Sequence, residues 1–103
     1  MSAANALRGE AELRVGDHVH VLRPSFAALV AAEAELGPLF ALVERTADAR
    51  LGLGELASLF WHCVQDRPET LTREAVGEAV IAQGLASATP ALRVLLGQIL
   101  QGR

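Results

Sequence analysis

The sequence predicts a mainly helical α+β fold, in which an N-terminal β-hairpin packs on a bundle of about five short helices. Residues 9–23 alternate between apolar and polar positions, as a half-buried strand pair does. Residues 25–101 repeat apolar positions at helical spacing between capping signals. The 103-residue chain is 51% hydrophobic, which suits one domain with a core. We therefore expect a flexible N-terminus over residues 1–8 and a single domain over residues 9–103.

The hairpin prediction includes a register. The apolar positions of one parity are Ala11, Leu13 and Val15 before a Gly-Asp turn and Val19 and Val21 after it. Pairing Val15 with Val19 would gather them on one face, and this requires a three-residue loop, Gly16–His18, or a bulge. Because the hydrophobic pattern sets the register of a half-buried pair, we predict the odd-length loop. His20 would then point outward, near Arg14.

Two helices are expected to follow the hairpin. Ser25 is the predicted N-cap of the first helix, which would turn Phe26, Leu29 and Val30 inward. Gly37 and Pro38 form a stop and restart signal, with the proline in the first turn of the next helix. That helix, ending near residue 47, is expected to bury Leu39, Leu42 and Val43, with Phe40 on its flank.

The segment Leu53–Val64 is the predicted centre of the fold. Its apolar stripe at helical spacing consists of Leu53, Leu56, Ala57, Phe60, Cys63 and Val64. The helical wheel places Cys63 in the core, His62 in solvent and Trp61 at the edge of the stripe. We expect other helices to pack against this stripe. Trp61, the only tryptophan, is interpreted as either a core rim or a partner anchor.

The fourth helix should begin after a loop that contains Pro68, with Thr70 or Thr72 as its N-cap. Its apolar face contains Val76 and Val80. The opposite face carries Glu74 and Glu78 at i, i+4 spacing, which is typical of a solvent-exposed helix face. Gly84 is expected to end the helix.

The last helix is predicted to start at Pro90, with Ser87 or Thr89 as its cap. Its broad apolar stripe consists of Leu92, Leu95, Leu96 and Ile99, widened by Val94 and Leu100. Two interpretations remain open: the stripe completes the core, or it binds a partner or a second copy. These four stripe residues and Trp61 are the predicted partner-binding residues.

Few residues indicate chemistry. His18 and His20 are spaced as half of a metal site, but no third ligand has a defined position. Cys63 beside His62 resembles a thiol nucleophile pair, but adjacent helical residues do not face each other. We predict no catalytic residue, no cofactor and no metal site.

Composition limits the remaining classes. The net charge is −3 and the arginines are scattered, so nucleic acid is not an expected partner. No apolar run reaches the roughly 20 residues that span a bilayer, and the N-terminus has no secretory pattern. A cytoplasmic, non-enzymatic protein that binds other proteins is the expectation.

Several stretches in a fixed order resemble a known family. Residues 7–10 lead into the hairpin, residues 21–29 read VLRPSFAAL, and residues 71–80 read LTREAVGEAV before Gly84. This order is similar to the small gene transfer agent tail proteins of alphaproteobacteria, which are grouped with phage tail tube proteins and tail assembly chaperones. The resemblance extends from about Leu7 to the C-terminus.

The resemblance implies a non-enzymatic role in virion tail morphogenesis, with tape measure or tail tube proteins, or a second copy, as partners. It places the protein in the cytoplasm or in the assembled particle. These family labels differ, and a tail tube subunit would be expected to have a larger β-sheet than one hairpin, so the sequence favours a tail assembly chaperone or accessory protein. The alternatives are a regulator or adaptor with a helix-turn-helix in residues 53–84, and a metal or thiol enzyme.

Overall fold

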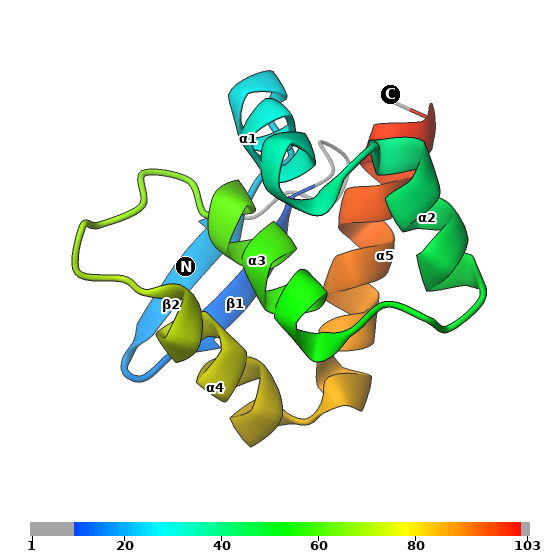
Figure 1. The fold of residues 1–103 in the computed structure, drawn as a ribbon. Coiled ribbons are helices and arrows are strands. Elements are labelled where there is room, and N and C mark those ends of the chain that lie inside the picture. The colour runs from blue at the N-terminus through cyan, green and yellow to red at the C-terminus, as the bar shows by residue number, and fades with distance from the viewer. Residues whose placement is uncertain (1–9, 102–103) are drawn as a thin grey trace.

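The computed structural model describes residues 10–101. It confirms the mainly helical class with an N-terminal antiparallel hairpin (Figure 1). The elements in chain order are β1 (Ala11–Val15), β2 (His18–Leu22), α1 (Phe26–Leu36), α2 (Leu39–Ala47), α3 (Leu53–Cys63), α4 (Arg73–Gln83) and α5 (Leu85–Gln101). The predicted flexible segment, residues 1–8, and Gly9 lie outside the described residues. No single helix in the described part of the chain is long and apolar enough to span a membrane.

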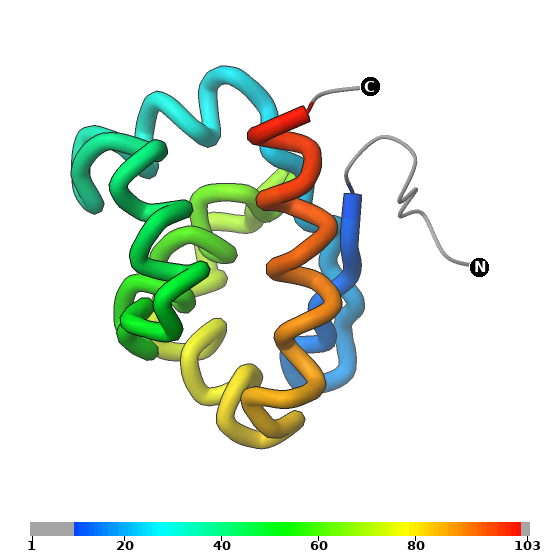
Figure 2. Tube along the Cα trace, turned by 90° about the vertical axis from the view of Figure 1, so that its right-hand side faces the viewer, coloured from blue at the N-terminus to red at the C-terminus, as the bar shows by residue number. Residues whose placement is uncertain are grey.

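Helix α3 forms the centre of the core. It packs between α1 and α4 and also contacts β2, while α5 packs on α4 and β1 (Figures 1 and 2). The buried residues of the α3 stripe are Leu56, Ala57, Phe60, Cys63 and Val64, and Leu59 is buried with them. The predicted stripe is therefore confirmed except at Leu53, which is 42% exposed because it begins the helix at the edge of the core.

The register of the hairpin differs from our prediction. Val15 pairs with His18 and Leu13 pairs with His20 across a two-residue loop. Gly16 begins this loop with φ +61°, as the first loop residue of a type II′ turn requires. Turn geometry therefore set the register. As a result Val19 and Val21 lie on the face of the hairpin that points away from the helices, and Val19 is 50% exposed. His20 does not point outward near Arg14, because it shares the helix-facing side with Leu13.

The outer edge of β2 is joined to the end of α3. The Arg23 amide donates to the Cys63 carbonyl at 2.7 Å, and the Gln65 amide donates to the Val21 carbonyl at 2.8 Å. Leu22 and Val64 form an isolated bridge between these bonds, and Leu22 is fully buried. The hairpin is thereby fixed to the central helix through backbone hydrogen bonds.

The inward face of α1 differs from the predicted one. Phe26 is 85% exposed and Val30 is 49% exposed, whereas Ala32 is fully buried. Leu29 is half-buried against the core, as expected. The sequence of α1 is apolar almost all round, so its periodicity could not identify which face packs against α3.

The capping signals predicted most helix ends. The Ser25 and Thr72 hydroxyl oxygens accept from amides of α1 and α4, and Gly37 and Gly84 end these helices with positive φ. Pro38 occupies the N-cap position of α2, one residue before the predicted one. Helix α5 begins at Leu85 and not at Pro90, which lies within it.

The early start of α5 has a packing explanation. Ala88 is buried, so the turn before Pro90 is held against the core in helical form. Pro90 is the sixth residue of α5 and has no backbone N–H, so the helix lacks one i→i−4 hydrogen bond at this position.

Candidate protein-interaction surfaces

Trp61, a predicted partner anchor, is covered by two guanidinium groups. The Arg67 guanidinium lies 3.5 Å from the ring centroid and that of Arg73 lies 4.4 Å away. The indole Nε1 donates to the Leu71 carbonyl at 3.1 Å. The ring is half-buried, and these contacts connect α3 to the loop before α4. Trp61 therefore belongs to the rim of the core in this structure.

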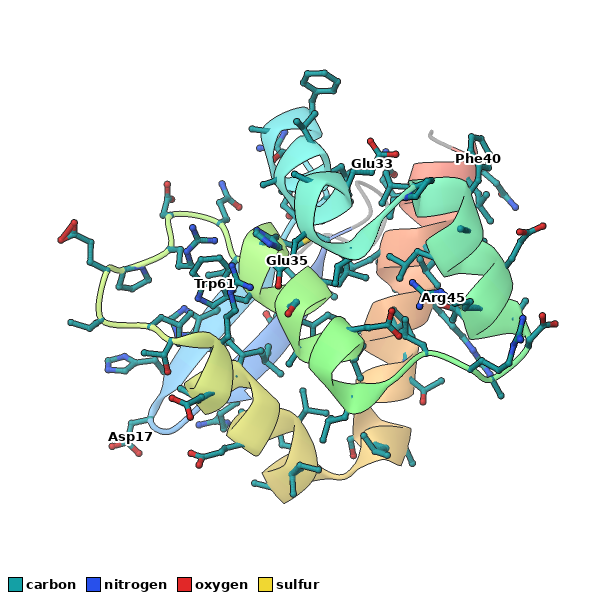
Figure 3. All side chains as sticks on the ribbon, in the orientation of Figure 1. Asp17, Glu33, Glu35, Phe40, Arg45 and Trp61 are labelled. Carbon is teal, nitrogen blue, oxygen red and sulfur yellow. The ribbon has the colours of Figure 1, made fainter. Side chains whose placement is uncertain are left out.

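Glu35 joins three helices beside Trp61 (Figure 3). Its carboxylate contacts the His62 Nε2 at 2.8 Å and accepts from the Ser58 hydroxyl at 3.3 Å. It also forms an ion pair with Arg73. The prediction that His62 lies in solvent is wrong, since its side chain is only 9% exposed. The physical reason is that the end of α1 extends over this side of α3, which the wheel of α3 alone does not show.

The contacts of the Glu35 carboxylate with His62 and Arg73 make the free energy of unfolding depend on pH. The His62 hydrogen bond, with the Arg73 charge, lowers the pKa of Glu35 below its ordinary value of 4.5. A lowered pKa in the folded state contributes stability above the unfolded pKa, and this contribution is lost as the pH falls through the folded value. We expect Glu35→Gln to reduce the free energy of unfolding by about 1 kcal/mol at pH 7, since the carboxylate is partly exposed.

Urea unfolding, followed by Trp61 fluorescence between pH 3 and 7, measures this effect. The difference between wild type and Glu35→Gln should shrink as the pH falls below about 4.5. Glu44→Gln is the control, because Glu44 is exposed on α2. A difference for Glu35→Gln that stays constant over this pH range would contradict the assignment.

His18 and His20 lie at a cleft between the hairpin and the start of α4. The cleft measures about 440 Å³, and its lining residues are Val15, His18, His20, Pro68, Thr70, Leu71 and Ala75. The two imidazole centroids are 6.4 Å apart. No group of three or more His, Cys, Asp or Glu side chains suited to a metal occurs within residues 10–101. The structure thus adds no third ligand to the pair.

Cys63 lies in the core, as predicted. The residue is 1% exposed, and burial raises the pKa of its thiol to about 12. Its neighbour His62 turns to Glu35 on the surface of α3. A protonated, enclosed thiol is a poor nucleophile, so the geometry does not support the thiol-enzyme alternative.

The helix-turn-helix alternative relies on polar side chains of α4. Arg73 is paired with Glu35 and stacked on Trp61, and the Gln83 amide donates to the Arg14 carbonyl at 2.5 Å. A recognition helix requires such side chains to be free for base edges. Both are engaged inside this protein, and so the arrangement does not favour DNA recognition.

The predicted stripe of α5 is divided between the core and a surface groove. Leu95 is fully buried and Leu96 is 9% exposed, whereas Leu92 and Ile99 are half-buried. The groove lies between α1, α2 and the last turns of α5 and encloses about 240 Å³. Its lining residues are Leu29, Glu33, Leu39, Phe40, Val43, Ile99 and Leu100. We call it the α1–α2–α5 groove.

Exposed apolar side chains surround this groove. Phe40 is 80% exposed and Leu100 is 52% exposed, and Figure 3 shows Phe40 close to the last turn of α5. A second hollow, beyond Glu33, is lined by Val30, Ala34, Gly37 and Pro38. Sequence reasoning placed Phe40 on a flank and Val30 inside, and so missed this surface. The signal available was the apolar character of α1 on all sides.

An exposed apolar groove on a small helical fold is typical of proteins that assemble with other proteins. The chain belongs to the family described as phage tail tube protein, GTA-gp10, which it matches over residues 8–102. This confirms the resemblance to gene transfer agent tail proteins, a family of structural tail components. Searches of curated proteins and of solved structures gave no match.

Proposed function

We propose that this chain acts without catalysis in the morphogenesis of a phage-like tail, as a chaperone-like or accessory protein of a gene transfer agent. In this role it covers apolar surface on the tape measure protein or another tail protein. The family description names a tail tube protein, and the proposal differs from it in the step that it assigns to this chain. The described residues contain one two-stranded sheet, which is small for the wall of a tube. That feature favours the chaperone-like role over the tube subunit.

The α1–α2–α5 groove is the observation that carries this proposal. Phe40 and Leu100 are both more than half exposed at its border, although burying a large apolar side chain is favourable by roughly 1.5–3 kcal/mol. The only charged residue in its lining is Glu33, whose carboxylate accepts from the Leu39 amide at 3.1 Å. An apolar helix of a partner fits such a groove. Of the predicted binding residues, Ile99 lines this groove, while Leu95 and Leu96 are buried.

A pull-down with the tape measure protein of a gene transfer agent tests the proposal. The informative variant is Phe40→Asp, which places a charge at the groove. Phe40 lies in the first turn of α2, where an acidic residue is favourable, so the fold should persist. We expect the retained partner to fall at least tenfold, because an anchor side chain accounts for about 1.4 kcal/mol or more.

Leu85→Asp is the matched control. Leu85 is 56% exposed and begins α5, so the same charge enters a first turn away from the groove. This variant should retain the partner as wild type does. Equal loss in both variants, or no association of the wild-type chain at micromolar concentration, would overturn the proposal.

A further inference from the structure

A second groove of different chemistry lies between the beginning of α3 and the outer face of α4. It encloses about 430 Å³, and its lining residues are Leu53, Glu74, Gly77, Glu78, Ile81 and Ala82. We call it the α3–α4 groove. Figure 1 places α4 and the C-terminal end of α5 on different sides of α3, so the α3–α4 groove is separate from the α1–α2–α5 groove.

The floor of the α3–α4 groove is apolar and open. Leu53 is 42% exposed and Ile81 is 56% exposed, although both belong to amphipathic helices whose other apolar residues are largely covered. Gly77 lines the groove on α4, one helical turn before Ile81, and has no side chain to fill the space. A Cβ at this position would meet the Ala57 Cβ at 3.5 Å, an ordinary contact. Packing therefore does not require glycine there, although glycine weakens a helix interior relative to alanine.

The rim of the α3–α4 groove is acidic. Glu74 and Glu78 are exposed and lie one helical turn apart on the same face of α4. Neither forms an ion pair with another described residue. Arg73, the one cationic residue of α4, is held by Glu35 and Trp61. No cation lines the groove to compensate the two carboxylates.

We infer that the α3–α4 groove binds a cationic amphipathic helix of a partner protein. Leu53 and Ile81 would contact the apolar stripe of that helix, and Glu74 and Glu78 would pair with Lys or Arg beside the stripe. From Glu74 to Ala82 the groove follows about 12 Å of α4, a length that two or three turns of a partner helix cover. The charge distinguishes this surface from the α1–α2–α5 groove, where Glu33 is already bonded within the fold.

The test uses a fluorescein-labelled 15-residue synthetic helix with leucine at i, i+3, i+4 and i+7 spacing and lysine elsewhere. Fluorescence anisotropy with the full chain measures its dissociation constant at low and moderate salt. A peptide with glutamate in place of lysine is the control for charge. We expect the lysine peptide to bind at least tenfold more tightly than the glutamate peptide, with a preference that weakens as salt rises.

Charge reversal locates the binding. The double variant Glu74→Lys with Glu78→Lys should weaken binding of the lysine peptide at least tenfold. The control, Glu44→Lys with Glu69→Lys, makes the same change in net charge at exposed carboxylates outside the groove. It should stay within about threefold of wild type, which is the expected size of a general charge effect. Equal weakening by both pairs, or no preference for the lysine peptide, would overturn the inference.

Substitutions at Gly77 and Gly97 separate binding from stability. Gly77→Ala adds a methyl group to the groove and should raise the thermal midpoint while weakening peptide binding about threefold or more. Gly97→Ala, in α5, places a Cβ with no atom within 4 Å beyond its chain neighbours and the backbone of its own helix, and it should raise the midpoint without changing binding. Unchanged peptide binding by Gly77→Ala would contradict the proposed role of Gly77. Phe40→Asp should bind the lysine peptide as wild type does, so this inference and the proposed function fail independently.

Discussion

Replacing Phe60 by alanine should reduce the free energy of unfolding by about 3–5 kcal/mol. Phe60 is fully buried in the middle of α3, where the core residues of the helices and the hairpin meet. A chain of this size has a total stability of about 5–15 kcal/mol, so this change removes a large part of it. Urea unfolding followed by far-ultraviolet circular dichroism gives the free energy and, through its slope, the compactness of both states.

Phe26→Ala is the matched control for Phe60→Ala. The same side chain is removed from a helix, but Phe26 is 85% exposed at the start of α1. Alanine is also the better helix former, so this variant should lie within about 0.5 kcal/mol of wild type. Similar losses in the two variants would show that α3 is not the centre of the core.

The local signals of the sequence predicted where most helices begin and end. Ser25 and Thr72 hydroxyls and the positive φ at Gly37 and Gly84 act within a few residues, so a linear reading captures them. The buried face of α3 could also be predicted from the sequence, because its apolar residues recur with a clear helical period. These features depend on neighbours in the chain rather than on the final packing.

Most of the predictions that failed depended on distant contacts. His62 is covered because Glu35 approaches from α1, which is 27 residues away in the chain. Phe26 and Val30 are exposed because only one face of an apolar helix can pack on α3. The hairpin register was decided by competition between turn geometry at Gly16 and hydrophobic patterning, and the sequence shows both preferences without their relative strength.

The candidate binding surfaces also depend on contacts between residues that are distant in the chain. The sequence identified Ile99 and the breadth of the α5 stripe, but the groove exists only where α1 and α2 meet the end of α5. Glu74 and Glu78 could be placed on one helix face from their spacing. Their proximity to Leu53 required the packing of α3 against α4. Composition therefore suggested binding to proteins, while the location of the surfaces came from tertiary structure.

Leu95→Ala should reduce the free energy of unfolding by about 2–5 kcal/mol. Leu95 is fully buried and belongs to the core cluster, so truncation leaves a cavity. Leu100→Ala, five residues further along α5 at a position that is 52% exposed, should change stability by less than about 0.5 kcal/mol. The same urea titration measures both variants, and a partner pull-down on the folded Leu100→Ala chain measures binding.

Leu95→Ala and Leu100→Ala together test which residues of the α5 stripe stabilise the fold and which bind the partner. If Leu95 supports the fold and Leu100 borders the α1–α2–α5 groove, stability and binding should respond to different residues of one helix. Leu100→Ala would then weaken association with the tape measure protein while leaving the unfolding midpoint unchanged. A stable Leu95→Ala variant with impaired binding would instead mean that α5 releases its buried stripe to the partner. In that case the apolar stripe of α5 would be buried in the core of the free chain and would contact the partner in the complex.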